Sequence, residues 1–156
     1  MRPPTVDLIR FMPAEGELNV PRPIGRLHVL TDLEGPRDPL AVVDAALAAG
    51  APVIQVRAKA VTDRARLALA EAAGATCLVD DRVDIALAAG ADGVHLGDED
   101  LPVAVARRLL GPDAVIGATA RDATAGQARV AEGADSLGVG PTYATTTKEG
   151  LHDPLG

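Results

Sequence analysis

Residues 79–102, VDDRVDIALAAGADGVHLGDEDLP, decide the fold predicted for this chain. An apolar run at 75–79, with the length of a buried strand, leads into this stretch, and a second short strand is predicted at 93–96. Between the two strands, small apolar residues predict a helix that ends at Gly90. The stretch therefore predicts a strand, a helix and a second strand, the unit from which α/β folds are built.

Acidic residues follow both of these strands. Asp80 and Asp81 come after the first strand, and an acidic run at 98–100 comes after the second. Because α/β folds place ligands at the carboxyl ends of parallel strands, carboxylates there can meet on one hard cation such as Mg²⁺. Asp81 and Asp100 are the candidate metal ligands. In the alternative interpretation, Asp80 or Asp81 is the N-cap of the helix that follows.

The same unit recurs along the chain, and glycine or an alanine-rich turn ends each helix. Polar and glycine-rich segments lie between each strand and the next helix, which favours a barrel with its site at the C-terminal face over a doubly wound sheet. The prediction is an α/β fold of the (β/α)8 TIM-barrel type with about six βα units, and thus an incomplete barrel. A proline-rich tail is expected at 1–25 and the barrel domain at 26–156, lacking its last two βα units. Strands are predicted at 27–31, 52–56, 75–79, 93–96, 115–118 and 136–139, and helices at 40–49, 63–73, 83–89, 103–110 and 123–132.

Composition excludes several classes of function. The chain has a formal net charge of -7, which disfavours nucleic acid and anionic membranes as main partners. Hydrophobic residues make up 47% and aromatic residues 1%, so the core must be aliphatic. No apolar run reaches the roughly 18 residues of a membrane span. Cys77 is the single cysteine, and a cytoplasmic location is expected. Walker A, GxGxxG and Ser/His/Asp patterns are absent from the sequence.

Two polar sets are candidates for binding an anion. Gln55, Arg57 and Lys59 alternate, so an extended strand would point all three to one face, either to bind a polyanion or as an ordinary strand end. The segment 145–148, Thr-Thr-Thr-Lys, offers hydroxyls and an ammonium suited to a phosphate monoester. Of 15 basic residues only Lys59 and Lys148 are lysines, and both lie in loop-like sequence. His95 is interpreted as a hydrogen-bonded core or packing residue of its strand rather than as a base.

Four motifs, taken together, resemble the thiamine phosphate synthase family over about residues 26–150. They are Gln55-x-Arg57-x-Lys59, then Asp81-Arg82, then ADGVHLG at 91–97 followed by DLP at 100–102, and finally GVGP at 138–141 followed by TTTK at 145–148. This resemblance implies a (β/α)8 barrel. It also implies a transferase that joins a hydroxymethylpyrimidine diphosphate to a thiazole phosphate with Mg²⁺, giving thiamine phosphate and pyrophosphate.

The resemblance also implies roles for individual residues. Asp81 and Asp100 would bind Mg²⁺. Arg57, Lys59 and Lys148 would be the catalytic residues that contact the diphosphate. The substrate-binding set would comprise Gln55, Arg57, Lys59, Asp80, Thr119, Thr145, Thr147 and Lys148, with Thr119 beside the diphosphate and Thr145 and Thr147 at the thiazole phosphate.

The chain departs from the family pattern in three places. Asp80 stands where the family usually has Asn, the segment between Lys59 and Asp80 is shorter than usual, and the family continues past Gly156 through two more strands. These departures motivate an alternative, a catalytically inactive truncated barrel that binds a phosphorylated ligand or a partner chain. A thiazole tautomerase-like branch is a further alternative, and a homo-oligomer is possible.

Overall fold

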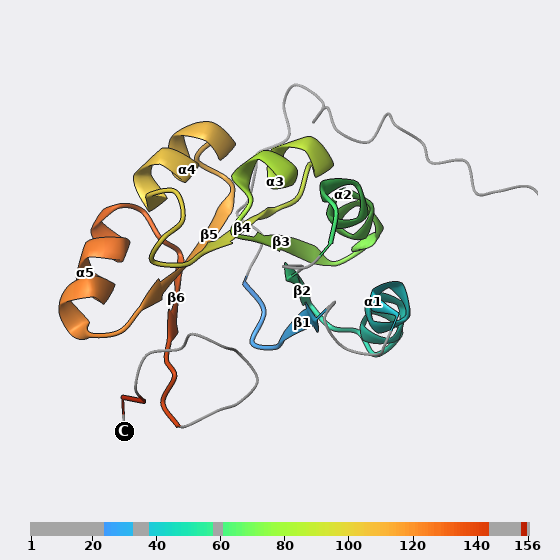
Figure 1. Ribbon diagram of the computed structural model, residues 1–156, viewed down its shortest axis with the longest axis horizontal. Coiled ribbons are helices and arrows are strands. Elements are labelled where there is room, and N and C mark those ends of the chain that lie inside the picture. The colour runs from blue at the N-terminus through green and yellow to red at the C-terminus, as the bar shows by residue number, and fades with distance from the viewer. Residues whose placement is uncertain (1–23, 33–37, 58–60, 144–153, 156) are drawn as a thin grey trace, which may run out of the picture.

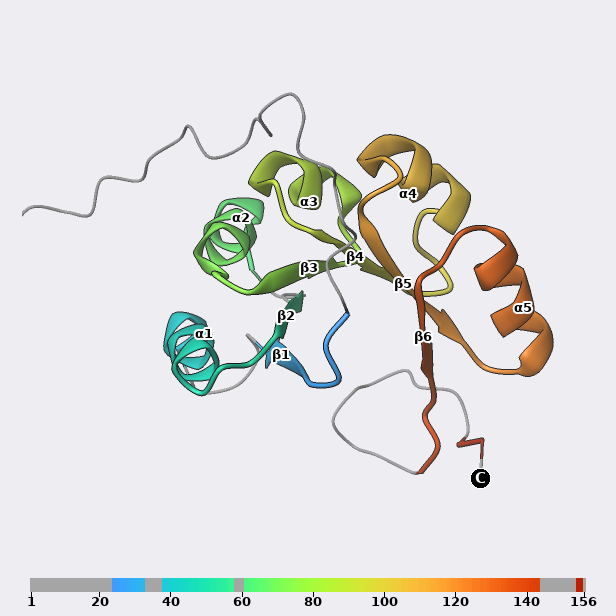
Figure 2. The ribbon, with the colours of Figure 1, turned by 180° about the vertical axis from the view of Figure 1, so that it is seen from behind.

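Six parallel strands form one curled sheet with five helices on its outer side. The computed structural model describes residues 24–32, 38–57, 61–143 and 154–155. Strand order follows chain order from β1 to β6, and every neighbouring pair is parallel. Figures 1 and 2 show the strands curving around a central space, with the helices outside. The α/β fold of TIM-barrel type with six βα strands is therefore confirmed, as a half-barrel.

The observed elements match the predicted ones, with boundaries shifted by a residue or two. The strands are β1 (His28–Asp32), β2 (Val53–Arg57), β3 (Thr76–Asp80), β4 (Gly93–Leu96), β5 (Val115–Ala120) and β6 (Ser136–Val139). The helices are α1 (Pro39–Ala48), α2 (Asp63–Ala72), α3 (Val83–Ala89), α4 (Val103–Leu110) and α5 (Ala123–Ala131). The described part of the chain has no helix long and apolar enough to span a membrane.

Side-chain caps fix the start of three helices. Asp38 accepts a hydrogen bond from the amide of Leu40 at the start of α1, and Thr62 and Asp122 do the same for α2 and α5. Each cap satisfies an amide that has no partner within the helix. These caps set the point where the chain turns from each strand end into the following helix.

Alternate strand residues face the helices and the barrel interior. The larger core lies between sheet and helices and includes Ile54, Val56, Val79, Val94 and Ile116. A smaller interior cluster, formed by Val53, Leu78 and Val115 with Ile24 against it, packs inside the curve of the sheet. Apart from Leu30 of β1, the remaining interior positions of the strands are polar or glycine, as a binding face requires.

A guanidinium joins the loops that enter β5 and β6. Arg107 of α4 donates to the carbonyls of Gly111, Pro112 and Ala114, and also to the carbonyl of Gly133 at 2.8 Å. Arg107 also pairs with Asp135 in the loop before β6. The Asp135 carboxylate lies 2.7 Å from Arg107 Nη2 and also accepts a hydrogen bond from the amide of Ile116. Because both loops lead into strand starts, this network stabilises the N-terminal face of the sheet, away from the loops that follow the strands.

Candidate active site

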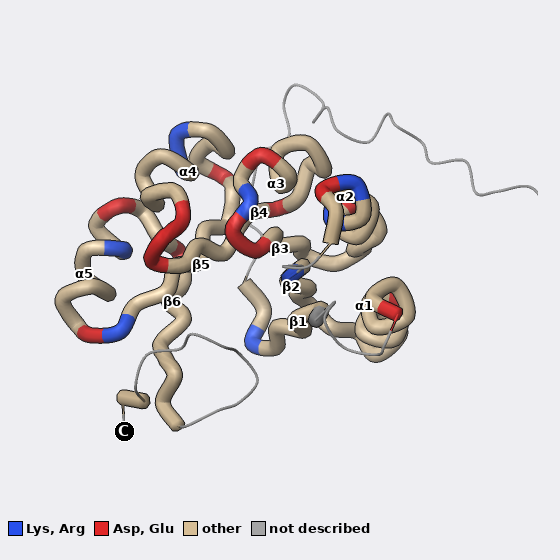
Figure 3. Tube along the Cα trace, viewed as in Figure 1, with Lys and Arg blue, Asp and Glu red and all other residues tan. Residues whose placement is uncertain are grey.

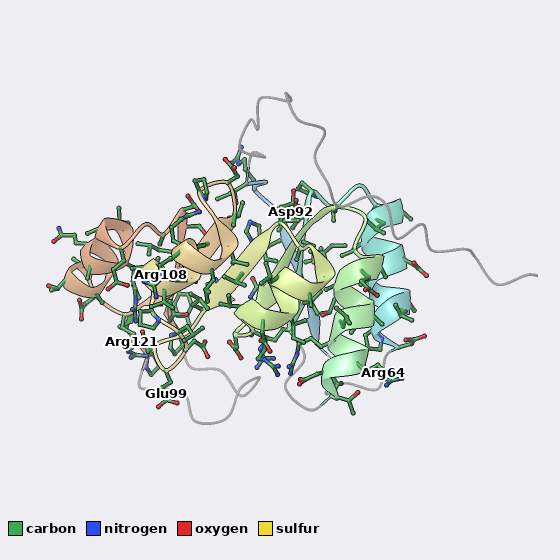
Figure 4. All side chains as sticks on the ribbon, turned by 90° about the horizontal axis from the view of Figure 1, so that it is seen from above. Arg64, Asp92, Glu99, Arg108 and Arg121 are labelled. Atoms are coloured by element: carbon green, nitrogen blue, oxygen red, sulfur yellow. The ribbon has the colours of Figure 1, made fainter. Side chains whose placement is uncertain are left out.

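The loops that follow the strands lie together on one face. Figure 4 places Glu99, after β4, and Arg121, after β5, on the same side of the molecule, with Asp92, before β4, on the opposite side. Figure 3 shows acidic segments in the loops that follow β3 and β4. The C-terminal face therefore holds the charged residues of successive strand ends, as the sequence predicted.

Gln55, Arg57 and Asp80 meet at the ends of β2 and β3. The buried Gln55 donates from Nε2 to Asp80 Oδ1 at 2.8 Å, and Arg57 Nε lies 3.9 Å from Asp80 Oδ2. Asp80 is itself buried, so its carboxylate is held by one amide and one guanidinium rather than by bulk water. This arrangement fixes both β2 side chains at the mouth of the barrel interior.

Asp80 belongs to the strand and not to the loop after it, where the apolar pattern had placed it. β3 includes Asp80, which pairs in register with His95 of β4. The chain turns at Asp81, whose φ of 64° lies in the left-handed region. The capping alternative for Asp80 and Asp81 is wrong, because the N-cap residue of α3 is Arg82 and no side chain caps that helix.

Asp81 and Asp100 line one pocket of ≈ 610 Å³ together with Arg82, Asp84 and Glu99, and apolar residues of α3 and α4, among them Leu87 and Leu109, complete its lining. Both candidate metal ligands therefore face the same space. Asp100 Oδ2 also accepts a hydrogen bond from the amide of Gly97 at 2.6 Å, which holds the loop after β4 against the strand end. Within the described residues no three His, Cys, Asp or Glu side chains gather closely enough to hold a metal by themselves.

His95 and Thr119 form a second polar contact on the inner face. His95 Nε2 lies 3.2 Å from the Thr119 hydroxyl. Burial lowers the pKa of His95 below its ordinary value of 6.5, and the nearby carboxylates of Asp80, Asp81 and Asp100 oppose this shift. The ring is therefore neutral near pH 7. The sequence predicted a hydrogen-bonded core or packing residue at this position, but not its partner Thr119, which lies 24 residues further along the chain.

Four predicted site residues lie outside the part of the chain that the structure describes: Lys59, Thr145, Thr147 and Lys148. Of the others, the structure brings together Gln55, Arg57 and Asp80 in one cluster, and Asp81 and Asp100 in one pocket. Thr119 lies on the inner face of β5 beside His95. Apart from Gln55, in the middle of β2, the described candidates lie in the last two residues of a strand or in the loop that follows it.

Three comparisons with known proteins agree with one another. A family model described as thiamine monophosphate synthase (TMP-TENI) matches residues 27–156. A thiamine-phosphate synthase from Salinispora tropica is 51% identical over 143 residues, covering 85% of this chain and 69% of that protein. A thiamine-phosphate synthase from Anaeromyxobacter dehalogenans is also 51% identical, covering 80% of this chain and 58% of that protein.

Among solved structures, the fold is similar to that of thiamine phosphate pyrophosphorylase from Pyrococcus furiosus. The TM-score is 0.64 at 36% sequence identity, and the match covers 74% of this chain and 60% of that chain. The chain thus spans between 58% and 69% of the length of these three proteins.

Proposed function

The chain belongs to the thiamine monophosphate synthase family, and we propose that it carries out the condensation that forms thiamine phosphate. In this reaction, 4-amino-2-methyl-5-(diphosphooxymethyl)pyrimidine loses pyrophosphate and its methylene carbon bonds to the nitrogen of 4-methyl-5-(2-phosphoethyl)thiazole. The observation that carries the proposal is that, in a chain from this family, neighbouring strand ends hold the Arg57–Asp80 pair and a pocket shared by Asp81 and Asp100.

Anion binding at this face is assigned to the cationic side chains. Arg57, which is half-buried at the end of β2, would donate to diphosphate oxygens, and its contact with Asp80 orients it toward the interior. Lys59 and Lys148 would contribute further positive charge to the leaving group. Thr145 and Thr147 would hold the thiazole phosphate, whose binding needs hydroxyl and amide donors.

The residues present suit a magnesium ion. Mg²⁺ is bound in proteins through one or two carboxylates together with substrate phosphates, so the Asp81 and Asp100 pair in one pocket matches its requirements without a third protein ligand. Asp81 and Asp100 would hold the ion, which when bound supplies positive charge that stabilises the departing pyrophosphate. A metal held jointly with substrate also agrees with the absence of a three-residue cluster in the described chain.

The chemistry requires no protein nucleophile. When the bond between the methylene carbon and the diphosphate oxygen breaks, the electron pair leaves with pyrophosphate and positive charge remains on the pyrimidinylmethyl group. The lone pair of the thiazole nitrogen then forms the new bond. Arg57 would stabilise the departing anion because its contact with Asp80 holds it in place before the charge develops, and Lys59 and Lys148 would add positive charge. Asp80 accepts a hydrogen bond from Gln55 Nε2 and would thereby orient that amide for the pyrimidine.

Pyrophosphate release tests this proposal. The purified chain is incubated with both substrates and Mg²⁺, and pyrophosphate is measured for the wild type and for Arg57→Gln, Asp81→Asn and Arg64→Gln. We expect release that needs both substrates, with a loss of about 10²-fold in Arg57→Gln and Asp81→Asn. Arg64, exposed on α2, is the matched control and should leave the rate unchanged. Equal rates in all four proteins would contradict the assigned site.

A further inference from the structure

We propose that His95 is a positioning residue that fixes the direction of the Thr119 hydroxyl, and that Gly117 and Gly138 form the slot that holds its ring. This inference rests on the proposed function, because it assigns the Thr119 hydroxyl to the diphosphate. Its basis in the structure is the 3.2 Å contact between His95 Nε2 and Thr119 Oγ1 together with the two glycines beneath the ring.

The glycines leave room that any other residue would fill. A Cβ atom at Gly117 would lie 2.6 Å from His95 Nδ1, and one at Gly138 would lie 3.1 Å from Cε1 and 3.4 Å from Nε2. The first distance is shorter than real Cβ contacts allow, and the second requires the ring to move. Neither glycine has a positive φ, so backbone conformation does not explain why glycine stands at these positions. Close contact with the imidazole of His95 does explain it.

Strand register produces this arrangement. Asp80, His95, Gly117 and Ser136 pair in register across β3, β4, β5 and β6, and all four face the barrel interior. The His95 ring leans from β4 across Gly117 and reaches Thr119, two residues further along β5. The side chain therefore crosses the sheet toward the C-terminal ends of the strands, where the diphosphate would bind.

The geometry of the contact suits this role. A threonine hydroxyl has one hydrogen and rotates freely unless a partner fixes it. With Nε2 bonded to Oγ1, the remaining hydrogen-bonding capacity of the hydroxyl points away from the ring. Whichever ring nitrogen carries the proton, the contact limits the hydroxyl to few directions. Thr119 would then meet the leaving group already oriented, which lowers the entropy cost in the transition state.

Steady-state kinetics on a double-mutant cycle tests the coupling. His95→Leu and Thr119→Val should each lower kcat about three- to tenfold, as expected for one hydrogen bond, with little change in KM. The double variant should lose no more than the worse single variant. His95→Gln places an amide where Nε2 lies and should recover most of the rate. His95→Asn places its amide near Nδ1 and should not.

Nuclear magnetic resonance of the imidazole nitrogens gives a readout that does not depend on turnover. The chain has 3 histidines, so spectra of His95→Gln and His28→Gln assign the signals. Thr119→Val should shift only the His95 signals, while Thr119→Ser should preserve them. Gly117→Ala should also shift them. His28, whose Nε2 contacts the carbonyl of Gly25 at 3.1 Å, is the matched control and should respond to none of these changes.

The two readouts separate the inference from the proposed function. Coupled losses in an active enzyme, with the expected shift of the His95 signals, support the inference. Additive losses in an active enzyme overturn the role of His95 and leave the proposed function standing. An inactive wild type with intact His95 coupling to Thr119 overturns the proposed function, and the role in catalysis with it. If the His95 signals do not change in Thr119→Val, the contact between His95 and Thr119 is wrong.

Discussion

Replacing Arg107 by Met should destabilise the fold strongly while leaving the C-terminal face intact. The Arg107 side chain is 22% exposed and that of Asp135 is 40% exposed, so solvent screens part of the interaction. The two hydrogens on Arg107 Nη1 are shared among the carbonyls of Gly111, Pro112 and Ala114. Nη2 donates to the Gly133 carbonyl at 2.8 Å and to the Asp135 carboxylate at 2.7 Å. Hydrogen bonds to charged groups contribute about 1.5–3 kcal/mol each, and with this screening the expected loss is about 3–4 kcal/mol.

Urea unfolding followed by circular dichroism measures this loss. Arg107→Met should lower the midpoint at an unchanged m value, and Arg107→Lys should recover less than half of the difference because an ammonium lacks the planar fork. Arg108→Met, an exposed neighbour on α4, is the control and should change the free energy of unfolding by no more than about 0.5 kcal/mol. KM for both substrates should stay unchanged in folded Arg107→Met. A loss below 1 kcal/mol, taken as roughly the value of a single ordinary hydrogen bond, would refute this account of the network.

Further predictions concern packing, titration and thiol reactivity. Gly93→Ala should destabilise the chain by at least about 3 kcal/mol in urea unfolding, because a Cβ would overlap the Val115 carbonyl; Gly74→Ala, where the Cβ meets only ordinary contacts, should be neutral. The Arg82 hydrogen bond lowers the pKa of Asp84 from 3.8 to about 2, so the stability that the ionised carboxylate supplies is present above pH 3.8 and is lost as the pH falls toward 2. Melting temperatures in low salt should show this acid loss in the wild type and a smaller one in Arg82→Met. Burial raises the pKa of Cys77 to about 12, so a thiol reagent at pH 8 should modify it only after denaturant is added; rapid labelling of the native protein would contradict its burial.

The fold could be predicted from the sequence because its elements have clear local signals. Apolar runs of strand length, helices ended by glycine and polar strand-to-helix loops predicted six strands in one order, and the structure confirms them. The boundaries of the first three strands are shifted by one residue toward the C-terminus. These three strands end in polar residues, Asp32, Arg57 and Asp80. A pattern that equates strands with apolar runs therefore ends each strand one residue too early.

The site was predictable only in part. The positions of Arg57, Asp81 and Asp100 on one face could be predicted because each ends or follows a strand, and strand ends in this fold lie on one face; their roles stay predictions. The contact of His95 with Thr119 could not, because it depends on register across β4 and β5 and on glycines that are remote in sequence. A glycine inside a predicted strand indicates that another group approaches the backbone closely, and Gly117 is such a glycine.

The most direct test of the central claim is the product itself. The purified chain is incubated with the pyrimidine diphosphate, the thiazole phosphate and Mg²⁺, and thiamine phosphate and pyrophosphate are quantified together by mass spectrometry. We expect both products to form in equal amounts, only when both substrates are present, and about 10²-fold more slowly in Arg57→Gln. Pyrophosphate without thiamine phosphate, or no product with a folded wild-type chain, would contradict the proposed condensation.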